Sequence, residues 1–154
     1  MDAFMKRAVE LTIANIKEGG QPFGAVLVKD GEIISEGVNE LHKVNDISGH
    51  AELLSIRRAQ EKLGTVDLTG YTMYASGEPC PMCLTAMYFS GIRDYYYCQS
   101  IEDAAAAGIG KSVYVYGEMK KDKINRDMKA NQMPLELAQE NPLDFWRKSV
   151  DKDK

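Results

Sequence analysis

Several features that mark particular classes of protein are missing from these 154 residues. No apolar run is long enough to span a bilayer, which excludes an ordinary transmembrane helix. The formal net charge of −4 lacks the basic excess that nucleic-acid-binding domains usually carry. Hydrophobic residues at 44% and charged residues at 27% lie in the ordinary globular range. We therefore expect one globular domain over residues 1–154, with neither a membrane nor a nucleic acid as its partner.

Cysteine is also scarce, with three in the chain, and Met1–Arg7 lacks the apolar stretch of a secretory signal. These two absences predict a cytoplasmic protein in a reducing compartment. In that setting, neighbouring cysteines bind a metal or carry out redox chemistry more often than they form a disulfide.

The spacing of apolar residues and turn signals predicts that helices alternate with strands. This alternation indicates a layered α/β domain with a mixed sheet of about five strands. The expected helices are 2–18, Ser48 (as the cap) to about Leu63, 81–90, a stretch within 103–119, and a short helix after Asn141-Pro142 that carries Trp146. The expected strands are 23–28, 32–38, 71–76, 94–99 and 133–138, with Asp30-Gly31 as a hairpin turn.

The stretch GEPCPMC, from Gly77 to Cys83, places two of the three cysteines three residues apart. Pro81 suits the first position of a helix, where a missing N–H costs nothing, so Cys80 is the expected N-cap. Residues three apart face the same way, and a helix N-terminus stabilises the negative charge of a thiolate. The two sulfurs can therefore converge on one cation.

One of the two histidines, His50, is the candidate for a third ligand, because it also stands at a predicted helix start. A catalytic zinc takes three protein ligands and leaves one position for water. His50, Cys80 and Cys83 are therefore the expected ligand set. Glu52 follows His50 by two residues, and the period of a helix places it about 200° around the axis. Spacing alone does not bring Glu52 near the metal.

Two other interpretations of the cysteine pair stay open, a structural zinc site and a redox pair. A structural site needs a fourth protein ligand, and Cys98 is the one cysteine left. We expect Cys98 to be a small buried residue of a strand. His42 is expected to be a polar loop residue, with a role at the mouth of a pocket as the alternative.

The two halves of the site together form a known pattern. His50-Ala51-Glu52 followed by Pro79–Cys83 matches the signature H-x-E…P-C-x-x-C, and the sequence resembles the zinc-dependent nucleobase and nucleoside deaminases. The stretches 22–39, 76–83 and 103–109 are most similar to bacterial guanine deaminases. The resemblance implies the three-layer α/β/α fold of the cytidine-deaminase-like proteins.

This resemblance also implies one Zn²⁺ per chain and the hydrolysis of guanine to xanthine and ammonia. Metal-activated water would attack the ring carbon that bears the amino group, while Glu52 transfers the protons. Asn39 would read the base edge and Phe23 would pack against the ring. The backbone N–H groups near Ala51 and Cys80 would hold the substrate. Members of the fold usually form dimers, so a homodimer with exchanged C-terminal segments is expected.

The sequence departs from the guanine deaminases in two places, and both concern substrate recognition. In those enzymes, acidic residues follow the segment that matches 103–109, and one of them lines the pocket. The stretch 108–112 of this chain has Gly110 and Lys111 instead. Their terminal aromatic residue has no counterpart in Asp151–Lys154. The side chains that we consider as replacements are Tyr114, Tyr116 and Glu118.

Three alternative functions therefore stay open. One is a tRNA adenosine (A to I) deaminase, which the net charge and the stretch 103–109 disfavour. Another is a deaminase of guanosine, cytosine or a different aminated heterocycle. The last is a zinc-stabilised binding protein without catalysis, which the intact Glu52 and the three-ligand set disfavour.

Overall fold

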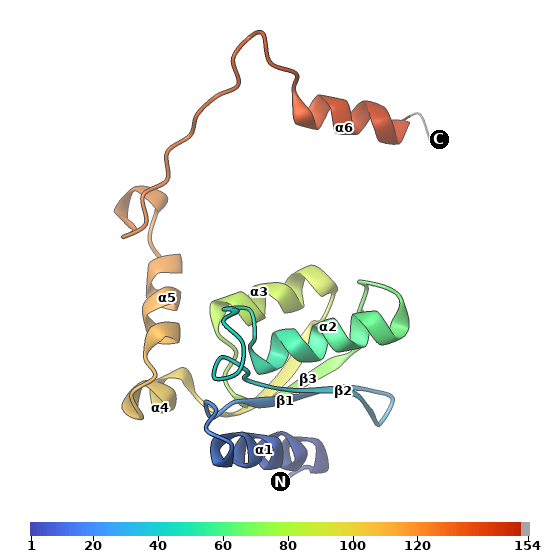
Figure 1. Ribbon diagram of the computed structural model, residues 1–154, viewed down its shortest axis with the longest axis vertical. Coiled ribbons are helices and arrows are strands. Elements are labelled where there is room, and N and C mark those ends of the chain that lie inside the picture. Colours follow the sequence, from blue (N-terminus) through green and yellow to red (C-terminus); the bar gives the residue numbers. More distant parts are fainter. Residues whose placement is uncertain (152–154) are drawn as a thin grey trace. The chain divides into compact units, whose positions relative to one another are not determined.

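The computed structural model describes residues 1–151 and divides the chain into two compact units, Met1–Lys120 and the segment that begins at Lys121 (Figure 1). The first unit contains the sheet and both halves of the predicted motif. Most of the chain end in which we sought a terminal aromatic residue, Lys152–Lys154, lies outside the described residues.

A mixed sheet of four strands forms the centre of the first unit, in the order β2-β1-β3-β4. β1 pairs antiparallel with β2 and with β3, and β3 pairs parallel with β4. The bounds are Gly24–Lys29 for β1, Glu32–Val38 for β2, Thr72–Gly77 for β3 and Asp94–Gln99 for β4.

The expected fifth strand at 133–138 is not formed, so that prediction was wrong. These residues are coil, and Met133 and Leu137 are almost fully exposed. An alternation of apolar and polar residues becomes a strand only where a neighbouring strand supplies hydrogen bonds and one face is buried. In the described part of its own unit, this segment has no strand to pair with and no surface that buries one of its faces.

Helices cover both faces of the sheet, which confirms the predicted three-layer α/β/α fold. α1 (Ala3–Lys17) packs on one face, while α2 (Ala51–Leu63) and α3 (Pro81–Ser90) lie on the other (Figure 1). The buried core comprises apolar residues from the sheet, from α2 and α3, and from the segments before β3 and β4: Ala25, Leu27, Ala51, Ile56, Ala59, Leu68, Tyr71, Met73, Ala75, Met87 and Ile92.

The start of α2 differs from the prediction, because its N-cap is His50 and not Ser48. The Ser48 hydroxyl instead donates a hydrogen bond to Oδ1 of Asp46 at 2.6 Å, within the loop that precedes the helix. The helix ends at Gly64 in a left-handed conformation, as predicted.

The predicted helix within 103–119 is two helices, α4 (Ile101–Ala106) and α5 (Lys111–Met119). Gly108 lies between them with a φ of 97°, a left-handed conformation that interrupts the helical path. The described part of the second unit contains a 3₁₀ turn (Lys123–Asn125) and α6 (Pro142–Asp151), which carries Trp146 as predicted. No helix in residues 1–151 is long and apolar enough to cross a membrane.

Gly37 of β2 marks the place where the sheet approaches α2 most closely, and its replacement should be costly. A Cβ at this position would overlap the carbonyl oxygen of Ala51 and lie 3.0 Å from the backbone nitrogen of Ser55. Because backbone atoms cannot swing aside, we expect Gly37→Ala to lower the free energy of unfolding by about 2 kcal/mol. Urea unfolding followed by circular dichroism measures this change.

Gly117→Ala is the matched control, since a Cβ at Gly117 of α5 would meet nothing within 4 Å. Alanine favours a helix over glycine, so this variant should be neutral or more stable by up to about 1 kcal/mol. Equal losses in the two variants would contradict the close approach as the cause.

Candidate metal centre

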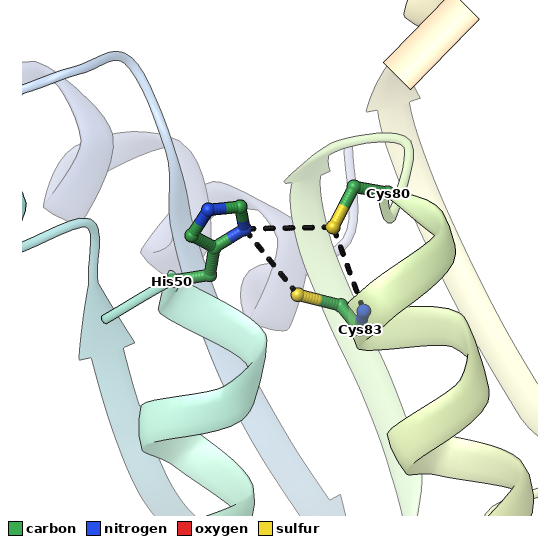
Figure 2. Close-up of side chains that lie close together, drawn as sticks. All are labelled: His50, Cys80 and Cys83. Atoms are coloured by element: carbon green, nitrogen blue, oxygen red, sulfur yellow. Dashed lines mark hydrogen bonds between the residues drawn. The ribbon is translucent and has the colours of Figure 1, made fainter. Parts of the chain in front are cut away.

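Three side chains from two helix starts converge on one point (Figure 2). Nδ1 of His50 lies 3.5 Å from Sγ of Cys80 and 3.6 Å from Sγ of Cys83. All three ligand atoms lie within 4.8 Å of one another. A tetrahedral zinc with ordinary Zn–S and Zn–N bond lengths separates nitrogen from sulfur by about 3.6 Å. The donor set and its spacing therefore fit zinc.

Local structure explains why the sulfurs and the imidazole meet. Cys80 is the N-cap of α3, Pro81 occupies the first helical position, and Cys83 lies in the first turn, as predicted. The N–H of Cys83 donates to Sγ of Cys80 at 3.5 Å, which holds the two sulfurs on one side. His50 is the N-cap of α2, so two helix N-termini point their free N–H groups toward the same region.

Hydrogen bonds within the cluster shift the pKa values of its two thiols in opposite directions. The bond from the Cys83 thiol, together with the neighbouring His50, lowers the pKa of Cys80 to about 4. The pKa of Cys83 is raised, chiefly because the negative sulfur of Cys80 holds its proton. The cluster thus carries one thiolate and one proton that a divalent cation can replace.

Glu52 lies beside the cluster, although helical spacing does not predict this position. The residue is 6% exposed, and its carboxyl group lies near enough to the Cys83 thiol to interact with it. His50 has an extended backbone (φ −88°, ψ 152°), so helical rotation begins only at Ala51 and the estimate of about 200° does not apply. Burial raises the pKa of Glu52 to about 7.

Asn39 and Ala51, which the resemblance assigns to substrate binding, lie at element ends. Asn39 is buried just after β2, and its Oδ1 accepts a hydrogen bond from the N–H of Leu41 at 3.0 Å, as in a turn. Its Nδ2 makes only a long contact of 3.4 Å with Oε1 of Gln21. Ala51 is the first residue of α2, so its N–H has no partner within the helix.

Phe23, the third residue with an expected substrate contact, lines a cavity of about 90 Å³. Its ring lies beside Gly77, where a Cβ would come within 2.9 Å of the ring. Ile109 and Ser112 also line the cavity. Both belong to the stretch 108–112, in which the sequence has no acidic residues like those of the guanine deaminases. This difference in sequence therefore lies in the lining of the cavity beside Phe23.

Cys98 and His42 lie outside the ligand cluster. In residues 1–151, that cluster consists of His50, Cys80 and Cys83, which leaves Cys98 no role as a fourth ligand. The prediction of a buried Cys98 was wrong, because β4 is an edge strand whose residues are exposed. His42 lies beside Gly20, at the end of the turn that follows α1.

A residue of α5 also reaches the loop that carries the cysteines. The hydroxyl of Tyr116 donates a hydrogen bond to the carbonyl oxygen of Pro79 at 2.5 Å. The sequence suggested Tyr116 only as one of several possible pocket residues. No pattern indicates this contact, because it joins residues that are 37 positions apart.

The fold and the site together define a zinc-binding deaminase. The chain matches the model of the cytidine and deoxycytidylate deaminase zinc-binding region over residues 1–99, which include the whole ligand set. It therefore belongs to this family.

Within this family, the chain is similar over nearly its full length to a guanine deaminase. It is 40% identical to that of Bacillus subtilis over 152 residues, which are 98% of this chain and 96% of the relative. The X-ray structure of guanine deaminase from Bacillus subtilis matches with a TM-score of 0.86 and covers 96% of this chain and 95% of that one. The tRNA-specific adenosine deaminase of Aquifex aeolicus is 34% identical over 145 residues, 94% of this chain and 93% of the relative.

Removal of one sulfur should abolish tight zinc binding. We expect Cys83→Ser to lose zinc, because two ligands cannot complete a zinc site and a neutral serine hydroxyl does not replace a thiolate ligand. Zinc per chain, measured by plasma mass spectrometry after dialysis, should fall from about one to near zero. Cys98→Ser is the control and should keep its zinc. Loss of zinc in both variants would contradict the proposed ligand set.

Proposed function

We propose that this protein hydrolyses guanine to xanthine and ammonia. The observation that carries the reaction type is the buried carboxyl group of Glu52 beside the cluster of His50, Cys80 and Cys83. The preference for guanine over other bases is supported by the similarity to a guanine deaminase along nearly the whole chain.

In this proposal, Nδ1 of His50 and the two Sγ atoms of Cys80 and Cys83 hold one Zn²⁺. Bound zinc lowers the pKa of a coordinated water molecule toward neutrality and so supplies the nucleophile. The protein's part is to hold three ligands at two helix starts and to leave the fourth position open. The rigid backbone at Pro81 and the close contact between Gly37 and α2 keep these starts in place.

Glu52 is proposed as the proton carrier. Its carboxylate takes a proton from the attacking water, gives it to a ring nitrogen of the base, and transfers the second proton to the departing amino group. One water is consumed, and the C–N bond to the amino group is replaced by a carbonyl group as ammonia leaves. Burial shields the carboxyl group from bulk water, so these transfers stay within the site.

Substrate binding is proposed to use Phe23, Asn39 and Ala51. The Phe23 ring forms a wall of a cavity, against which a planar base can pack. The weakly held Nδ2 of Asn39 and the N–H of Ala51 are hydrogen-bond donors for carbonyl or ring-nitrogen acceptors of the base. Guanine offers such acceptors.

Glu52→Gln tests the proton carrier without changing the size of the side chain. Glutamine cannot accept and return a proton, so kcat should fall by at least about 10³-fold while zinc content stays near one per chain. Ammonia release from guanine, guanosine, cytosine, adenine and a tRNA anticodon stem-loop is measured for both proteins. Wild-type turnover in the variant would exclude this role.

The same substrate panel tests the choice of guanine. Guanine should be the base that releases ammonia fastest. If the stem-loop is deaminated instead, the chain follows its tRNA-specific relatives in substrate as well as in fold. If another free base is preferred, the stretch 108–112 has changed the shape of the pocket.

We further propose that the protein acts in the cytoplasm as a homodimer whose C-terminal segments are exchanged. The described part of the second unit leaves many large apolar side chains exposed, among them Met128, Met133, Leu137 and Trp146. On α6, Leu143, Trp146 and Val150 share one face by their spacing. Such a segment cannot bury these side chains by itself, and a second copy of the chain can cover them.

The apolar face of α6 should therefore control the oligomeric state. Leu143→Asp together with Trp146→Asp places charges on this face and should convert a dimer, of twice 17.2 kDa, into a monomer. Light scattering coupled to size-exclusion chromatography measures the mass. Lys148→Asp is the control on the same helix and should remain dimeric. A wild-type monomer would contradict the proposal.

A further inference from the structure

Tyr116 contacts the backbone immediately before a zinc ligand. Its hydroxyl donates to the carbonyl oxygen of Pro79 at 2.5 Å, and the next residue in the chain is Cys80. Pro79 is fully buried, and α5 packs against α3, so the contact lies within the folded unit. A short hydrogen bond at a partly buried site holds its acceptor in one orientation.

Because a peptide bond is planar, the hydrogen bond to the carbonyl of Pro79 also affects the direction of the Cys80 N–H. The Pro79–Cys80 bond is trans, as are all described peptide bonds, so the carbonyl of Pro79 and the N–H of Cys80 point in opposite directions. A bond that fixes the carbonyl therefore also fixes the direction of the N–H. No protein group in residues 1–151 accepts a hydrogen bond from this N–H. It is a free donor at the start of the zinc-binding helix.

The surrounding residues leave few other ways to orient this peptide. The φ angles of Pro79 and Pro81 are fixed by their rings, and Pro81 also restricts the backbone of Cys80. The Pro79–Cys80 peptide therefore turns chiefly about ψ of Pro79 and φ of Cys80. Tyr116 restrains that rotation. The residue comes from α5, which lies beyond residue 99, where the match to the family model ends. The restraint is thus supplied by the part of the chain that the family model does not cover.

We propose that Tyr116 is a positioning residue that aims the Cys80 N–H at the substrate and holds Cys80 in its zinc-binding orientation. The part that concerns the substrate rests on the proposed deamination. Burial raises the pKa of Tyr116, so the hydroxyl stays protonated and remains a donor at neutral pH. The bond joins α5, which begins directly after Gly110, to the metal loop. The stretch that departs from the guanine deaminases is thereby connected to the reacting centre.

Tyr116→Phe removes the hydroxyl and keeps the ring. Loss of one hydrogen bond should make zinc loss to an excess of chelator about five-fold faster. With Co²⁺ in place of zinc, the sulfur-to-cobalt charge-transfer bands should shift. If the Cys80 N–H is no longer oriented toward the substrate, kcat should fall about ten-fold, while KM changes less than about two-fold.

Two comparisons separate positioning from simple packing. Replacement of Tyr116 by p-aminophenylalanine restores a donor at the same place and should recover the chelator resistance, the cobalt spectrum and most of kcat. Tyr88→Phe, on the exposed side of α3, is the matched control and should behave as the wild type. If Tyr116→Phe does not fold, p-methylphenylalanine takes its place, because it fills the volume of tyrosine without a donor.

The inference is overturned if the donor-free variant matches the wild type in chelator resistance and cobalt spectrum. It is also overturned if p-aminophenylalanine behaves like phenylalanine. The metal readouts require no turnover of guanine. A wild-type protein that fails to deaminate guanine, but whose cobalt spectrum responds to Tyr116→Phe, would contradict the proposed substrate and leave the positioning role in place.

Discussion

The meeting of two helix N-termini at one point is the constraint on which the rest of this structure depends. The imidazole of His50 and the sulfurs of Cys80 and Cys83 come from residues that begin α2 and α3. Each helix start brings free N–H groups and a partial positive charge, which favour thiolates and hydrogen-bond acceptors in the base. The metal site and the expected substrate donors thus share one structural origin.

The sheet serves this site by fixing where each helix begins. Gly37 lets β2 approach the first turn of α2, and the hydroxyl of Ser35 donates to the carbonyl of Ser55 at 2.6 Å on the same side. α3 follows β3 after only three residues, so the register of β3 sets the position of Cys80. Burial of Glu52 is a further consequence, because α2 packs against both the sheet and α3, the helix that carries the cysteines.

The part of the chain that follows β4 supplies none of the candidate metal ligands in the described residues, but it lies close to the site. The family model ends at residue 99, and the helices that follow contribute walls and restraints instead of ligands. Ile109 and Ser112 line the cavity beside Phe23, and Tyr116 holds the carbonyl that precedes Cys80. In the proposed function, such a division separates the metal chemistry, which tolerates little change, from the surface that would select the base. Our proposal about Tyr116 places one link between the two.

The sequence by itself determined the elements that depend on local patterns. The proximity of Cys80 and Cys83, the N-cap of α3, the Asp30-Gly31 turn and α6 all follow from spacing and from residue type, whose effects extend over a few positions. The tertiary structure alone decided the features that depend on distant partners. Glu52 turns toward Cys83 because His50 is extended. Cys98 is exposed because β4 is an edge strand. Residues 133–138 form no strand because no strand in the described part of their own unit pairs with them.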